Sequence, residues 1–298
     1  SDGSGYTPNE KLTGLLKKEA ELENEYSVKY AEFCSDDSKN VYQKYNQEMG
    51  ELYIELIKTR KEIAKLQNFD SYEQLAYRSY GREYSPEALD GFISAIKKYV
   101  APLYKESKDN GLFKKSRPDI MGPNKAFMVV RESLEGINKS IDDAMSFMCR
   151  LSLYDVHMND TKYEQSYVTY IDKYDCPFLF FSPYGNESDV LSIAHEFGHY
   201  IDNYVNFGNS SDLDTSETFS QALEYLILCR IDDTELADLL TDYKLLETIT
   251  IYLNQGVLNE FERKAFELTD EELAVEAPNK LYGDIAVEYG ITEKFDKD

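Results

Sequence analysis

Hydrophobic residues recur with a helical period along most of the chain. In segments 10–33 and 39–67, apolar side chains fall every three or four residues between many Glu and Lys. This pattern predicts a long αα-hairpin at the start of the protein. A short helix is predicted over 71–80 and a longer one over 85–104, in which Pro102 is a candidate for a kink.

The pattern changes after Asp160. Segments 163–171 and 176–181 are rich in β-branched and aromatic residues, which predicts two strands, and a Ser-Pro-Tyr-Gly turn follows them. The rest of the pattern is helical, and the further helices are predicted over 125–134, 141–151, 188–205, 216–230, 233–253, 256–268 and 270–289. The sequence therefore predicts a mainly α protein whose small sheet lies directly before the helix 188–205.

The same change of pattern suggests how the chain is organised. Residues 1–9 are rich in Gly, Ser and Pro and are expected to form a flexible N-terminus. Residues 10–160 are expected to form a helical N-terminal subdomain. Residues 161–298 are expected to form a second subdomain, which contains the motif described below.

Composition narrows the classes of function. The chain has 298 residues and a formal net charge of −24, so repulsion from phosphate backbones excludes a general nucleic-acid partner. No apolar run approaches the roughly 20 residues that span a bilayer. The start shows no signal peptide, which favours the cytoplasm but leaves the compartment open. The four cysteines are widely scattered, a pattern that favours four buried free thiols over disulfides.

The sequence H-E-F-G-H, from His195 to His199, carries the clearest chemistry. Two of the three histidines of the chain lie here, four residues apart on one helical face, so that their imidazoles can converge on one metal ion. Zn²⁺ is the usual ion for such a pair, and Glu196 is placed to act as general base on a water molecule at the ion. Gly198 costs about 1 kcal/mol relative to Ala inside a helix, which a close approach of another backbone segment would explain.

A catalytic zinc site needs a third protein ligand and an open position. No histidine follows His199, and His157 lies upstream in an expected loop, where an ordinary surface role is favoured. A carboxylate is therefore the best candidate. Glu217 and Glu224 lie two turns apart on one face of the next predicted helix, and either could complete the site on spacing alone.

The segment from Cys176 to His199 resembles the active-site region of the M3 metallopeptidases, the family of thimet oligopeptidase and oligoendopeptidase F. Members of that family carry an apolar strand, a Gly-containing turn and then H-E-x-G-H on a helix. The segment from Glu217 to Glu224 resembles their next helix, which begins with a ligating Glu and continues Ser-Gln-x-Leu-Glu. The resemblance implies one Zn²⁺ ion bound by His195, His199 and Glu217, with Glu224 in a supporting position.

The resemblance is strongest over residues 160–230. It implies a zincin-like metallopeptidase catalytic domain, with the two subdomains making one M3-like catalytic unit. It also implies the hydrolysis of peptide bonds in oligopeptides, which would be the substrates, with Glu196 activating water. The strand at 163–171 would be the sheet edge to which the substrate backbone adds. The oligomeric state stays open.

The end of the sequence departs from the family pattern. Family members continue into a Tyr-rich segment, often with a His, that stabilises the tetrahedral oxyanion. This sequence ends at Asp298 in a charged tail, with no further histidine. We therefore keep two alternatives: an inactive or truncated zinc-binding helical protein that binds peptides without cleaving them, and a helical scaffold with an accidental motif. Metal binding is expected to survive the loss of such a segment better than catalysis.

Overall fold

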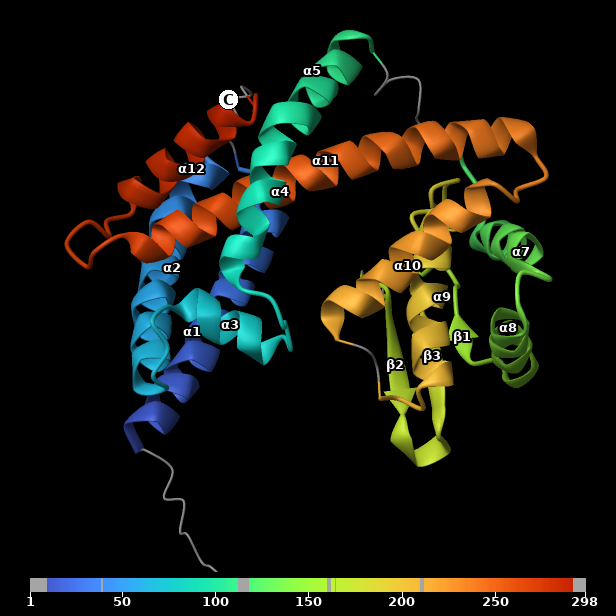
Figure 1. Ribbon diagram of the computed structural model, residues 1–298, viewed down its shortest axis with the longest axis horizontal. Helices are drawn as coiled ribbons and strands as arrows, with labels where there is room; N and C mark the ends of the chain where they lie inside the picture. The colour runs from blue at the N-terminus through green and yellow to red at the C-terminus, as the bar shows by residue number, and fades with distance from the viewer. Residues whose placement is uncertain are drawn as a thin grey trace, which may run out of the picture. The chain divides into compact units, whose positions relative to one another are not determined.

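The computed structural model describes residues 10–38, 40–111, 118–159, 162–163, 165–209 and 212–291. These residues are mainly helical and include one three-stranded sheet, as the sequence predicts (Figure 1). The segment expected to be a flexible N-terminus, 1–9, lies outside the described residues. Contacts divide the chain into a first unit, Ser1–Lys105 with Thr250–Asp298, and a second unit, Glu106–Ile249.

This division does not coincide with the boundary expected at residue 160. The helices α7 (Pro123–Leu134) and α8 (Lys139–Leu151) belong to the second unit. Their buried side chains, such as Val130 and Met148, share a hydrophobic core with Phe197. The amphipathic faces of these two helices are therefore covered by the residues that follow them in the chain.

The first unit is built on the predicted αα-hairpin. Helices α1 (Glu10–Ser35) and α2 (Val41–Leu66) pack together, and Ser71 caps the short helix α3 (Tyr72–Ser79) by accepting a hydrogen bond from the Gln74 amide. The next helical segment consists of Pro86–Leu89, α4 (Asp90–Ala95), the π-helical turn Ile96–Val100 and α5 (Ala101–Asp109). The π turn lies directly before Pro102, whose ring and missing N–H disturb regular α-helical bonding.

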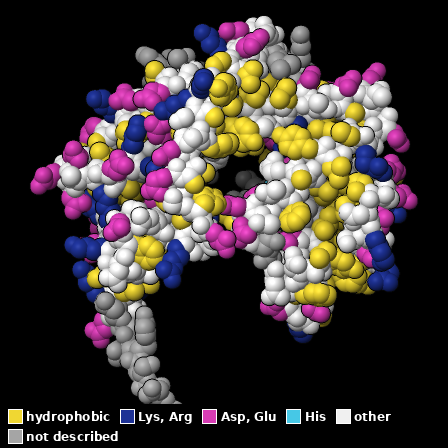
Figure 2. Space-filling view, in the orientation of Figure 1, with side chains coloured by type: hydrophobic (Ala, Val, Ile, Leu, Met, Phe, Trp, Pro, Cys, Tyr) yellow, Lys and Arg dark blue, Asp and Glu magenta, His cyan; other side chains and the backbone are white. Residues whose placement is uncertain are grey.

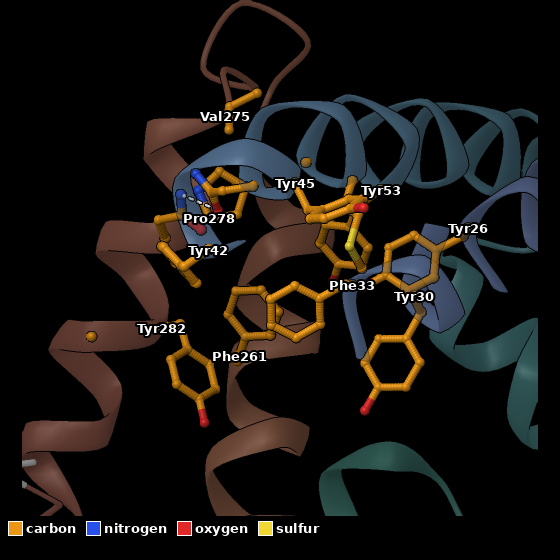
Figure 3. Close-up of a pocket in the computed structure, with 15 residues that line it drawn as sticks. Tyr26, Tyr30, Phe33, Tyr42, Tyr45, Tyr53, Phe261, Val275, Pro278 and Tyr282 are labelled. Carbon is orange, nitrogen blue, oxygen red and sulfur yellow. Dashed lines mark hydrogen bonds between the residues drawn. The ribbon is translucent and has the colours of Figure 1, made fainter. Parts of the chain in front are cut away.

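Aromatic side chains line a groove in the first unit (Figure 3). Its volume is about 420 Å³, and α1, α2, α11 (Thr234–Glu267) and α12 (Glu276–Glu288) contribute to its walls. Tyr53 stacks on Phe261 with ring centroids 5.9 Å apart, and Tyr282 meets the same ring edge-on at 5.6 Å. None of the described residues that line the groove carries a charged side chain.

Helix α11 is one continuous helix, so the prediction of two helices divided near Gly256 is wrong. A Cβ atom at Gly256 would lie 2.7 Å from Cε1 of the buried Tyr289 ring. The glycine therefore accommodates a tightly packed aromatic side chain and does not end the helix. The last predicted helix, 270–289, is shorter in the structure, where α12 begins at Glu276.

The sheet of the second unit has the order β1-β3-β2. Strands β2 (Tyr167–Ile171) and β3 (Cys176–Phe180) are antiparallel, and the two-residue strand β1 (Tyr154–Asp155), which the sequence does not predict, runs parallel to β3. Helix α9 (Asp189–Val205) packs on β2 and β3, and α10 (Leu213–Leu228) packs on α9 (Figure 1).

The turn before α9 is held by a buried carboxylate. Asp189 is fully buried, and its two oxygens accept hydrogen bonds from the backbone amides of Tyr184 and Gly185, each at 2.9 Å. Burial raises the pKa of Asp189, although the bonds from these amides oppose the rise. Gly185 has a φ of 79°, a conformation that glycine adopts without strain. These bonds fix where α9 begins relative to β3.

The surface charge, the helices and the cysteines can be compared with the sequence. Acidic side chains are distributed over the face of the molecule in Figure 2, consistent with the strongly negative net charge. None of the described helices combines the length and apolarity needed to cross a membrane. All four cysteines are free, as their scattered positions predict, but the expectation that all are buried is wrong: Cys176 is buried, whereas Cys34 and Cys229 are exposed.

Candidate metal centre

Helix α9 presents the two histidines of the motif on one face. The rings of His195 and His199 lie 4.9 Å apart between centroids and are nearly perpendicular, at 80°. On the other side of the helix, Phe197 and Tyr200 are fully buried and stack on each other with centroids 5.8 Å apart. The apolar face therefore fixes the rotation of α9 and turns both imidazoles toward α10.

Gly198 lies where α10 crosses α9. A Cβ atom built on it would lie 2.6 Å from Cα and 3.1 Å from the backbone N of Ser220. The expectation that another backbone segment approaches this glycine is thus confirmed. The two helices are in direct backbone contact, which brings side chains from the start of α10 to the histidines.

Glu217 is one of these side chains. Its Oε2 lies 3.4 Å from His195 Nε2 and its Oε1 lies 3.5 Å from His199 Nε2. All three ligand-type atoms fall within 4.8 Å of one another. Tetrahedral bonds of 2.0–2.1 Å separate ligand atoms by about 3.3 Å, so this donor set fits a zinc ion. The Glu217 side chain is 45% exposed, which leaves the cluster accessible to solvent.

Glu224, the other carboxylate that spacing left open, lies on the far side of His195. It is only 4% exposed, and its Oε1 lies 2.8 Å from His195 Nδ1. Its Oε2 accepts a hydrogen bond from Lys244 Nζ at 2.5 Å. The structure therefore brings Glu217 to the Nε2 atoms and engages both oxygens of Glu224 elsewhere.

Lys244 is a residue of this region that the sequence analysis does not identify. It occupies α11 four residues after the buried Leu240, which itself lies four residues after the buried Leu236. A lysine in such an apolar i, i+4 series is the signal that could have found it. Burial lowers the pKa of Lys244, but hydrogen bonds to Glu224 and Glu247 outweigh that effect and raise it overall.

The Nδ1 atom of the second histidine has a different partner. His199 Nδ1 lies 3.0 Å from the hydroxyl oxygen of Ser216, the residue directly before Glu217 in α10. Burial and the neighbouring His195 lower the pKa of His199. For His195, burial also lowers the pKa, but Glu224 and the other nearby carboxylates outweigh it, so that the pKa rises.

Glu196 is half-buried next to His195, and its Oε2 atom is buried. Its Oε2 has no hydrogen-bond partner among the described residues, which is an uncommon state for a buried polar atom. Burial raises the pKa of Glu196 to about 7, and Glu217 and Glu224 add to the rise while His195 opposes it. Among the described residues nothing occupies this oxygen, so it can accept a hydrogen bond from a bound water molecule.

The third histidine lies apart from the cluster. The side chain of His157 is 80% exposed, and its Nδ1 lies 3.2 Å from Asp155 Oδ1. The structure thus brings His195, His199 and Glu217 together, with Glu196 adjacent to His195 in the chain, and leaves His157 at the surface, as the sequence analysis favoured.

Comparison with solved structures places this architecture among known folds. A PZ peptidase A, determined with an inhibitor, matches with a TM-score of 0.79 and 18% identity over 98% of this chain and 61% of its own. A protein described as oligoendopeptidase F matches with a TM-score of 0.77 and 20% identity, over 97% of this chain and 60% of its own. A protein of Bacillus anthracis described as oligoendopeptidase F matches with a TM-score of 0.74 and 18% identity, over 94% of this chain and 61% of its own.

Neither the models of protein families nor the curated proteins give a match. At these identities the structural likeness defines the fold: the chain has the mainly helical fold of the oligoendopeptidase F and PZ peptidase type. The resemblance noted in the sequence is therefore confirmed at the level of the fold. The chain spans about three fifths of the length of these three structures.

Proposed function

We propose that this chain contains the zinc site of a metallopeptidase that hydrolyses peptide bonds in oligopeptides. The observation that carries the proposal is the convergence of His195 Nε2, His199 Nε2 and a Glu217 carboxylate oxygen within 4.8 Å. A buried carboxylate oxygen of Glu196, which has no partner in the described part of the chain, lies beside them. The fold shared with PZ peptidase A and oligoendopeptidase F supports the same reading.

Each residue has a distinct role in this proposal. His195, His199 and Glu217 would hold one zinc ion, and Glu224 would support His195 from its Nδ1 side. A zinc ion, when bound, polarises the scissile carbonyl and acidifies a water molecule. Glu196 accepts the proton of the attacking water and passes it to the leaving amine, as a general base and then a general acid.

The sheet supplies a candidate position for the substrate backbone. Strand β2 pairs with β3 on one side and is an edge strand of the described sheet. Its unpaired backbone groups suit the addition of an extended peptide by β-augmentation. This supports an unfolded oligopeptide as the substrate class, because a folded protein does not offer a free extended segment.

The test uses point variants, a zinc measurement and a quenched fluorescent peptide. Glu196→Gln should bind zinc like the wild type and lose cleavage, since general-base catalysis contributes about 10²–10⁴-fold. Glu217→Ala should lose stoichiometric zinc. Turnover retained by Glu196→Gln would refute the assigned base, and unchanged zinc content in Glu217→Ala would refute the assigned ligand.

The same assay separates the alternatives. Cleavage that a chelator abolishes excludes a protein that only binds peptides. Stoichiometric zinc with peptide binding and no cleavage would support the binding protein instead. The accidental-motif alternative predicts no stoichiometric zinc in the wild-type chain.

A further inference from the structure

Lys244 is a buried cation whose hydrogen-bonding capacity is fully used. The residue is 1% exposed. Its Nζ donates to Glu224 Oε2 at 2.5 Å, to Glu247 Oε2 at 2.8 Å and to Gln221 Oε1 at 3.1 Å. An ammonium group has three N–H donors, so each has one acceptor. A buried charge is tolerated only when it is paired and hydrogen-bonded, and here Glu224 is the buried partner.

The pair constrains the chemistry of His195 through Glu224. An ionised carboxylate only accepts hydrogen bonds, so the close contact between Glu224 Oε1 and His195 Nδ1 requires the proton to lie on Nδ1. In a neutral imidazole the other nitrogen then carries the lone pair. That nitrogen, Nε2, is the atom that faces Glu217. The buried network therefore leaves the lone pair of His195 directed at the proposed metal position.

His199 provides an internal comparison. Its Nδ1 contacts the hydroxyl of Ser216, a group that can either donate or accept a hydrogen bond. A serine partner therefore does not impose a tautomer on its own. Of the two histidines of the motif, only His195 has at its Nδ1 atom a carboxylate that is itself paired with a buried lysine.

We propose that Lys244 is a positioning residue of the metal site: it holds the Glu224 carboxylate against His195 Nδ1 and so keeps the Nε2 lone pair available to the ion. The inference rests on the proposed zinc site, but not on peptidase activity, because metal affinity and the histidine tautomer can be measured without a substrate. A lysine that only tied α10 to α11 would affect stability, and metal affinity with it, but would leave the tautomer of His195 unchanged.

The first test compares two buried lysines of the second unit. Lys244→Met removes the network, whereas Lys162→Met removes a lysine with a 6% exposed side chain that donates to the carbonyls of Asp155, His157 and Phe181. Both variants should lower the unfolding midpoint. Zinc affinity, measured on the full chain by competition with a chelator, should fall by about 10–100-fold in Lys244→Met and stay unchanged in Lys162→Met.

The second test is a double-mutant cycle with Glu224→Gln. In that single variant Lys244 still attracts the amide oxygen, so the amide NH₂ faces His195 Nδ1 and favours the wrong tautomer. In Lys244→Met with Glu224→Gln the oxygen is free to accept from Nδ1 again, and no buried charge is left unpaired. The double variant should therefore bind zinc more tightly than either single variant, whereas losses that simply add would overturn the proposal.

The tautomer itself gives a readout that stability does not move. With only three histidines in the chain, ¹⁵N-histidine labelling resolves each ring. At alkaline pH, wild-type His195 should be protonated at Nδ1, and Glu224→Gln should shift the proton to Nε2. Wild-type tautomer and zinc affinity in Lys244→Met would overturn the inference. A zinc-binding chain without peptidase activity would refute the proposed function and leave the role of Lys244 standing.

Discussion

The contact between Gly198 and Ser220 predicts an outcome in which stability and metal binding separate. In Gly198→Ala, the new Cβ would lie 2.6 Å from Ser220 Cα. Carbon atoms in ordinary contact lie about 3.5–4.0 Å apart. Neither partner is a flexible side chain, so α9 and α10 must move apart by about 1 Å at this point.

The free energy of unfolding should change only moderately. Overpacking of this kind costs about 1–3 kcal/mol, and the replacement of a helical glycine by alanine returns about 1 kcal/mol. The net loss is therefore about 0–2 kcal/mol.

The geometry of the metal site should change more than the stability. Separations of 3.4 and 3.5 Å between Glu217 oxygens and the two Nε2 atoms would grow to about 4.5 Å, beyond the roughly 3.3 Å between ligands of a tetrahedral zinc ion.

The assay measures urea unfolding and zinc affinity on the same protein. Zinc affinity of Gly198→Ala should fall by more than the roughly 10–100-fold that the loss of a supporting hydrogen bond causes, because a ligand itself is displaced. Gly14→Ala is the matched control: Gly14 lies in α1, and a Cβ there meets nothing within 4 Å. That control should gain up to about 1 kcal/mol and bind zinc normally.

Two results would refute this reasoning. Wild-type zinc affinity in Gly198→Ala would mean that the helices need not approach so closely to build the site. A fall in zinc affinity no larger than the fall in the folded fraction would mean that the substitution acts on the fold alone.

Three further predictions concern stability, and each is checked by unfolding measurements. Asp189→Ala leaves the amides of Tyr184 and Gly185 without acceptors and should cost about 1–3 kcal/mol for each, so a near-neutral result would contradict the role of this carboxylate. Gly256→Ala forces a methyl group against a buried ring and should destabilise the protein, although the same change on an open helix surface stabilises it. Asp155 is partly desolvated, which raises its pKa, but bonds from the backbone amide two residues on and from a buried lysine outweigh this and hold the pKa below its usual value. A carboxyl group whose pKa is lower in the folded than in the unfolded state stabilises the protein at pH values above its unfolded-state pKa, and this stabilisation is lost as the pH falls through its folded-state pKa. The difference in free energy of unfolding between wild type and Asp155→Asn should therefore shrink below about pH 4. A gap independent of pH would contradict this assignment.

The helices could be predicted well because their information is local. The apolar periodicity of α2 and α9 follows directly from the faces that they bury. Strand β1 was missed because a strand of two residues is too short to show alternation. The continuity of α11 was missed because Gly256 has a reason to be there only once the ring of Tyr289 is in place.

The division into two units could not be predicted for a related reason. A change of texture from helical to strand-rich near residue 160 is a local property of the sequence, whereas a unit is defined by which faces cover one another. From the sequence, α7 and α8 are assigned to the N-terminal helical subdomain, residues 10–160. Their buried residues, however, contact the core built on α9.

Only part of the candidate site could be predicted from local sequence patterns. His195 and His199 are one turn apart on a single helix, so their common direction follows from the helical period alone. The choice between Glu217 and Glu224 depends on where α10 crosses α9, and no spacing along the chain contains that point. The crossing at Ser220 lies between the two carboxylates and sends the first to the Nε2 side of the histidines and the second to the Nδ1 side.

This crossing makes the register of α10 a requirement of the site. A slip of α10 by one turn would bring Gln221 to the place of Glu217, and an amide is a poorer zinc ligand than a carboxylate. The same slip would remove Glu224 from His195 Nδ1 and leave Lys244 buried without its carboxylate partner. Because an unpaired buried ammonium is strongly disfavoured, the ion pair penalises the wrong register. Gly198 and Lys244 therefore act on the same property, one by allowing the close crossing and the other by fixing which turn of α10 occupies it.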